Sequence, residues 1–163
     1  MGGSDLGPFG AVHVGPTAER VPGLIEDLVV FMRRDDLPVL AHAALAHAQF
    51  ETIHPFTDGN GRTGRALVHA MLRAKRLTRR VTVPVSAGLL TDTSRYFDAL
   101  DAYRTGDPEP IVERMAHAAL RGAQEARVLV AELVEIHARW QDRITARPQA
   151  CLLYTSDAAD DTP

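Results

Sequence analysis

One short run of residues concentrates groups that can bind a phosphate chain. Residues 54–65 read HPFTDGNGRTGR and precede a predicted helix. Residues 59–61 expose the backbone there, and the unpaired N–H groups of a helix start attract anions. Arg62 and Arg65 are three residues apart, so their guanidinium groups share one helix face and can bind further phosphate oxygens. The run therefore predicts a polyphosphate site and favours a triphosphate over a single anion.

Two side chains in the same run add chemistry to this site. A carboxylate beside phosphate is repelled unless a cation lies between them, so Asp58 is interpreted as an anchor for Mg²⁺. His54 lies four residues earlier and can accept a proton near neutral pH. Phe56 is expected to fix the loop by packing into the core.

Simpler readings exist for each part of the run. Residues 58–61 alone form a common turn signal, Asp58 could cap the following helix, and a lone His54 is more often structural. The Walker pattern G-x-x-x-x-G-K-[ST] is missing from the sequence. The combination of all these groups within one loop nevertheless favours a functional site.

Composition indicates a folded, helical protein. The 163 residues are 45% hydrophobic and only 6% aromatic, with a net charge of −3. Residues 1–150 are neutral, which makes nucleic acid an unfavoured partner.

No apolar run approaches the roughly 20 residues that span a bilayer, so we expect no membrane association and a cytoplasmic location. A zinc site is also unfavoured, because the only cysteine is Cys151 and no H-E-x-x-H pattern occurs.

Apolar spacing predicts an all-α fold with one small peripheral β-hairpin near residues 11–14. Helices are expected at about 22–34, 38–52, 62–76, 92–105 and 110–144, and residues 81–90 are interpreted as a connector with some strand character. In the third helix the inward face is expected to comprise Ala66, Leu67, Ala70, Met71 and Leu77.

The predicted domain covers residues 1–145 and is expected to be truncated at its N-terminus. Residues 146–163 are interpreted as a tail, either disordered or non-native read-through. The segment CLLYTSDAADD within it resembles a translated sequencing adapter.

The run HPFTDGNGRTGR resembles the signature of Fic domains, HPFx[DE]GNGRxxR, at every fixed position. The segments AHAQFETIHPF, RALVHAML, PVSAGLL and YFDALDAYRTGDPEPIV are similar to the same family. The resemblance implies a Fic-type helical bundle. It also implies an enzyme that transfers AMP from ATP to a Ser, Thr or Tyr hydroxyl of a protein substrate, with Mg²⁺ as cofactor.

The resemblance assigns roles to individual residues. His54 would be the catalytic base, and Asp58 would hold Mg²⁺ on the phosphates. Arg104 stands where many members have Asn. Phe97 also has a plainer reading as a core residue, which we favour. The nucleotide-binding set would be Asp58, Gly59, Asn60, Gly61, Arg62, Thr63, Gly64, Arg65, Tyr96 and Phe97.

Upstream, the segment GAVHVGP resembles the family's flap, a hairpin that docks the target by strand pairing. The docking residues would be Ala11, Val12, His13 and Val14, with a plain surface hairpin as the alternative. Many members carry an inhibitory helix with the pattern [ST]xxxE[GN], which residues 1–150 lack. A missing inhibitory helix or a separate antitoxin is therefore an expected partner.

Two other functions stay open. One is a different Fic-type transfer, of UMP, phosphocholine or phosphate, or removal of AMP. The other is a non-catalytic nucleotide-binding module of a toxin–antitoxin pair.

Overall fold

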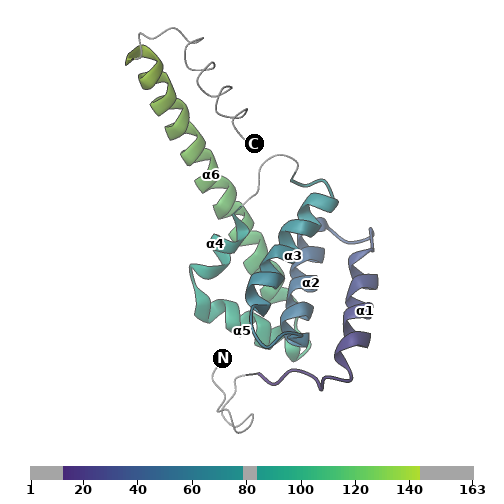
Figure 1. Ribbon diagram of the computed structural model, residues 1–163. Coiled ribbons are helices and arrows are strands. Elements are labelled where there is room, and N and C mark those ends of the chain that lie inside the picture. Colours follow the sequence, from purple (N-terminus) through teal and green to yellow (C-terminus); the bar gives the residue numbers. More distant parts are fainter. Residues whose placement is uncertain (1–12, 79–83, 144–163) are drawn as a thin grey trace, which may run out of the picture. The chain divides into compact units, whose positions relative to one another are not determined.

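A computed structural model describes residues 13–78 and 84–143 of the chain. This part contains six α-helices and no strand (Figure 1): α1 (Val21–Met32), α2 (Val39–Ile53), α3 (Asn60–Ala74), α4 (Val85–Leu90), α5 (Thr93–Arg104) and α6 (Glu109–Arg143). The prediction of an all-helical fold is confirmed for these residues. The predicted hairpin is not shown, since Ala11 and Val12 lie outside the described residues and His13 and Val14 form no strand.

The chain divides into two compact units, Met1–Gln124 and Glu125–Pro163. The predicted tail, residues 146–163, lies outside the described part, and the predicted domain boundary at residue 145 stays a prediction. Among the described residues no helix is both long and apolar enough to cross a membrane.

Helix α2 is the central element of the first unit, with α1 and α3 packed beside it (Figure 1). Its sequence VLAHAALAHAQFETI is rich in alanine, and Ala43, Ala44, Ala46 and Ala48 are each fully buried. Small side chains let neighbouring helices approach α2 closely on several sides. His47 and Phe50 of α2 are also buried.

The buried face of α3 agrees with the predicted one in part, since Met71 is buried and Leu67 packs against the core. Ala66 and Ala70 are exposed and Leu77 is 58% exposed, whereas Val68 and Leu72 are buried. The buried residues Asn60, Gly64, Val68, Met71 and Leu72 form one stripe along the helix. Gly64 explains the phase, because its missing side chain brings this stripe against α2.

Residues 85–90 form helix α4, so the expected strand character is wrong there, while residues 81–83 lie outside the described part. Gly88 lies against α6 at Ala118, since a Cβ at this position would come 2.7 Å from the Ala118 Cα. The missing side chain of Gly88 therefore allows α4 to pack closely against the backbone of α6. Helix α5 begins as predicted, with Asp92 accepting a hydrogen bond from the Arg95 N–H at 3.1 Å.

Candidate functional site

The predicted loop joins the end of α2 to the start of α3. His54 follows the last residue of α2 in a left-handed conformation, with φ 49° and ψ 57°. Its N–H still donates to the Phe50 carbonyl at 2.9 Å, which closes the helix. A left-handed residue turns the chain away from the helix axis. The His54 side chain therefore does not continue the side-chain rows of α2.

Gly59 caps the start of α3 with φ 85°, a conformation that glycine adopts without steric cost. The Thr63 hydroxyl donates to the Gly59 carbonyl at 3.0 Å. The amide groups of the first turn of α3 therefore begin at Gly59, as the sequence predicted, and an anion can approach them.

Asn60 fixes the loop through two hydrogen bonds to the backbone of one residue. Its Oδ1 accepts from the Phe56 N–H at 3.0 Å, and its Nδ2 donates to the Phe56 carbonyl at 2.6 Å. Asn60 is only 2% exposed. Phe56, by contrast, is 51% exposed, so the expectation that it fixes the loop by packing into the core is wrong. Asn60 instead fixes the loop through its hydrogen bonds. The sequence prediction missed them because it considered only the apolar Phe56 side chain.

Asp58 lies at the exposed mouth of the loop. One carboxylate oxygen accepts from the Gly59 N–H at 2.7 Å, and the other pairs with Arg62 at 3.0 Å. Both side chains are largely exposed, so the ion pair is weak and either group can turn to another partner. An exposed carboxylate at this position fits the way Mg²⁺ binds, through one or two carboxylates together with phosphate oxygens.

Gly64 lies against the face of α2 that carries His47 and Glu51. A Cβ on Gly64 would press into the Glu51 carboxylate and come 3.0 Å from His47 Nδ1. Arg65 lies beside Gly61, with Nη1 3.2 Å from where a Gly61 Cβ would be. Burial raises the pKa of Glu51, while the positive charges of Arg65 and Arg104 act in the opposite direction.

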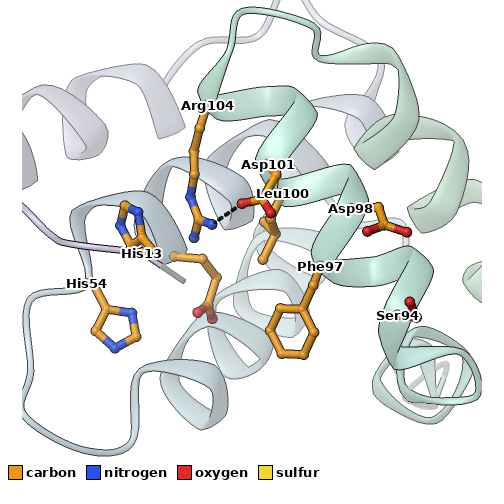
Figure 2. A pocket seen from close by; sticks show the side chains of 9 residues that line it. His13, His54, Ser94, Phe97, Asp98, Leu100, Asp101 and Arg104 are labelled. Atoms are coloured by element: carbon orange, nitrogen blue, oxygen red, sulfur yellow. Dashed lines mark hydrogen bonds and ion pairs between the residues drawn. The ribbon is translucent and has the colours of Figure 1, made fainter. Parts of the chain in front are cut away.

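A cleft of about 300 Å³ opens beside His54 (Figure 2). His13 and His54 lie on one side of it, and Phe97 and Leu100 of α5 lie on the other. Its volume is at the lower end of the range for small-molecule sites. The lining residues are His13, Glu51, His54, Ser94, Phe97, Asp98, Leu100, Asp101 and Arg104.

The environment of His54 favours its neutral form. Partial burial lowers the pKa of His54, and the positive charges of His13 and Arg104 lower it further. A hydrogen bond that the imidazole donates to the backbone carbonyl of Glu51 acts in the opposite direction and raises this pKa. A neutral imidazole facing a cleft can accept a proton from a bound hydroxyl.

His13 links the N-terminal segment to this catalytic candidate. Its Nε2–H donates to the Thr52 carbonyl at 2.8 Å, and its ring lies edge-on to His54, with centroids 6.4 Å apart. Gly15 passes close by, since a Cβ there would lie 3.2 Å from the Ile53 carbonyl oxygen. Val14 is 60% exposed. Whether residues 11–14 dock a target stays a prediction.

The two adjacent aromatic residues of α5 face different environments. Tyr96 is 5% exposed, and its hydroxyl lies 2.9 Å from His47 Nε2. Burial raises the pKa of Tyr96 above its usual range and lowers that of His47 to about 4. Phe97 is 49% exposed and lines the cleft, so core packing is the wrong reading for it. That both bind nucleotide stays a prediction.

Glu51 and Arg104 line the cleft but were not chosen as site residues from the sequence. Glu51 Oε1 and Arg104 Nε are buried and make no hydrogen bond within the described ranges. Arg104 is held by Asp101, which accepts from its Nη1 at 2.7 Å. Glu51 lies in the last turn of α2, three residues before His54, and this proximity in sequence was the available signal.

Comparison with known proteins places this site in a family. The family model described as Fic/DOC family matches residues 5–72. A probable protein adenylyltransferase of Aquifex aeolicus is 43% identical over 70 residues, which are 42% of this chain and 22% of that protein. The protein adenylyltransferase Fic of Nematostella vectensis is 32% identical over 111 residues, or 66% of this chain and 25% of the relative.

A solved structure agrees with these matches. The crystal structure of a Fic family protein from Desulfovibrio desulfuricans G20 has a TM-score of 0.64 and 34% sequence identity. The similarity covers 72% of this chain and 36% of that one. The chain thus spans between a fifth and a quarter of the curated relatives named here. The loop signature, these relatives and the shared fold identify the chain as a member of the Fic/DOC family.

Proposed function

We propose that the chain is a protein adenylyltransferase that moves AMP from ATP to a hydroxyl side chain of a target protein. The observation that carries the proposal is the cleft that His54 shares with Phe97, in a chain whose loop after His54 leads to the glycine-capped start of α3. A nucleotide whose base occupies the cleft can extend its phosphates toward the amide groups at Gly59. The names of the relatives, protein adenylyltransferases, support the same reaction class.

In the proposed step the target hydroxyl oxygen attacks the α-phosphorus of ATP. The new bond joins this oxygen to the α-phosphorus, and the bond from the α-phosphorus to the bridging oxygen of the β-phosphate breaks. Pyrophosphate leaves, and His54 accepts the hydroxyl proton. The lowered pKa of His54 keeps the imidazole free to accept that proton at neutral pH.

The positive groups of the loop stabilise charge on the phosphates. The amide groups at the start of α3 face one end of the phosphate chain, and Arg62 and Arg65 hold its oxygens. Asp58 would hold Mg²⁺, which neutralises phosphate charge when it is bound. Asn60 keeps these groups in place through its two bonds to Phe56.

Two labelled forms of ATP distinguish this reaction from its alternatives. The chain is incubated with Mg²⁺, a mixture of soluble proteins, and ATP labelled on either the α- or the γ-phosphate. In a parallel incubation UTP labelled on the α-phosphate replaces ATP. We expect label on protein, the chain itself included, from α-labelled ATP only. Label from γ-labelled ATP would indicate phosphate transfer, and label from α-labelled UTP but not ATP would indicate UMP transfer. No label on protein from any of them would reject a transferase and leave the non-catalytic reading.

A further inference from the structure

The second unit carries exposed apolar side chains that no described residue covers. In α6 beyond Gln124 the large apolar side chains are between 38% and 63% exposed. In the first unit, by contrast, the apolar residues Ile111 and Met115 of the same helix are fully buried. The exposed residues are Val128, Leu129, Val130, Leu133, Val134, Ile136 and Trp140.

The spacing of these residues fits a partner helix. Leu129, Leu133, Ile136 and Trp140 follow one another at intervals of four, three and four residues, and Ala126 precedes them by three. This alternation is that of a coiled-coil seam, in which each apolar residue inserts between residues of a facing helix. Arg127 and Glu135 lie away from the seam on the helical wheel.

The charges along one edge of the seam change sign near its middle. Glu125 and Glu132 precede the midpoint, and Arg139 follows it, all on the same flank of the apolar stripe. If a second identical helix runs antiparallel with its midpoint between residues 134 and 135, Glu132 of each copy faces Arg139 of the other. In the same register Leu133 faces Ile136, and Leu129 faces Trp140.

We propose that this face of α6 is an interface between two copies of this chain, paired antiparallel through residues 126–140. A partner of one charge sign would match either the acidic or the basic half of the flank, but not both. A second antiparallel copy places opposite charges against both halves. A parallel pair would instead place Glu132 near His137 and would not bring Glu132 to Arg139. The exposed Glu135–Arg139 pair within the helix, at 3.8 Å, leaves Arg139 available for a second carboxylate.

Sedimentation and light scattering over a broad dilution series test the proposal on the whole chain. We expect a dimer that dissociates on dilution. Glu132→Arg and Arg139→Glu each place two like-charge contacts in the dimer, so each should raise the dissociation constant about tenfold or more. The control is Glu135→Arg, which makes the same charge change on the same helix away from the seam and should leave the constant within about twofold.

Mixing the two weakened variants gives the decisive outcome. One copy with Glu132→Arg and one with Arg139→Glu restore opposite charges at both contacts, so the mixture should form heterodimers at the wild-type concentration. Circular dichroism verifies that each variant keeps its helix content. A monomeric wild-type chain, a dimer insensitive to Glu132→Arg, or a mixture that stays dissociated would each overturn the proposal.

Discussion

Gly64→Ala tests the packing that joins the loop helix to the centre of the fold. Gly64 is buried where α3 meets α2. An added Cβ would press into the Glu51 carboxylate and lie 3.0 Å from Nδ1 and 3.1 Å from Cε1 of His47. His47 is fully buried and Glu51 is 6% exposed, so neither side chain can swing into solvent without losing its packing.

Two opposing effects determine how much Gly64→Ala changes the free energy of unfolding. Alanine in a helix is more favourable than glycine by about 1 kcal/mol. Forcing a methyl group into a packed contact costs about 1–3 kcal/mol. Gly23→Ala isolates the first effect, because Gly23 lies in α1 and no atom falls within 4 Å of its added Cβ. The free energies of unfolding of the two variants should therefore differ by about 1–3 kcal/mol, with Gly64→Ala the less stable.

Urea unfolding followed by circular dichroism measures both values. A double-mutant cycle identifies the contact. In a Glu51→Ala background the carboxylate is gone, so the steric cost of Gly64→Ala should fall by about 1 kcal/mol or more. Equal stability of Gly64→Ala and Gly23→Ala, or strictly additive effects of the Glu51 and Gly64 substitutions, would refute the proposed close approach of α3 to α2.

Three further predictions concern the buried polar groups and the cleft. The folded-state pKa of His47, about 4, lies below its ordinary value of 6.5. The unfolded chain therefore takes up the proton first, and stability should fall by about 3 kcal/mol as pH drops from 6.5 to 4. Urea unfolding at several pH values should show a shallower slope for His47→Gln, and an unchanged slope would contradict the assignment. Asn60→Ala removes both bonds to Phe56 and should cost about 1–3 kcal/mol of stability and weaken nucleotide binding, measured by urea unfolding and calorimetry. Phe97→Ala should weaken ATP binding with little loss of stability, whereas Tyr96→Phe should lower stability by about 1 kcal/mol and leave ATP binding unchanged. Loss of ATP binding in Tyr96→Phe but not in Phe97→Ala would show that the adenine base does not bind beside Phe97.

The positions of the helices followed from the sequence because the signals are local. Asp92 caps α5, and Pro22 lies in the first turn of α1. The loop was equally visible, since its glycines, arginines and His54 are adjacent in sequence. The Gly59 cap and the nearby His54 agree with that reading.

Contacts between distant segments were not predictable in the same way. Gly64 was read as a nucleotide-binding residue, and its approach to Glu51 depends on how α3 rotates against α2. That rotation also reversed the expected burial of Ala66 and Val68. Phe56 was placed in the core by its apolarity, but the Asn60 bonds satisfy the loop backbone and leave the ring at the surface.

The central claim is that His54 accepts a proton in a cleft that also holds a nucleotide. The most direct measurement compares the native chain with His54→Ala for two properties, ATP affinity by calorimetry and transfer of α-phosphate label to protein. We predict that ATP binds both chains with similar affinity and that transfer is lost only in His54→Ala. Equal transfer by the two chains would contradict the assignment of His54 as the base.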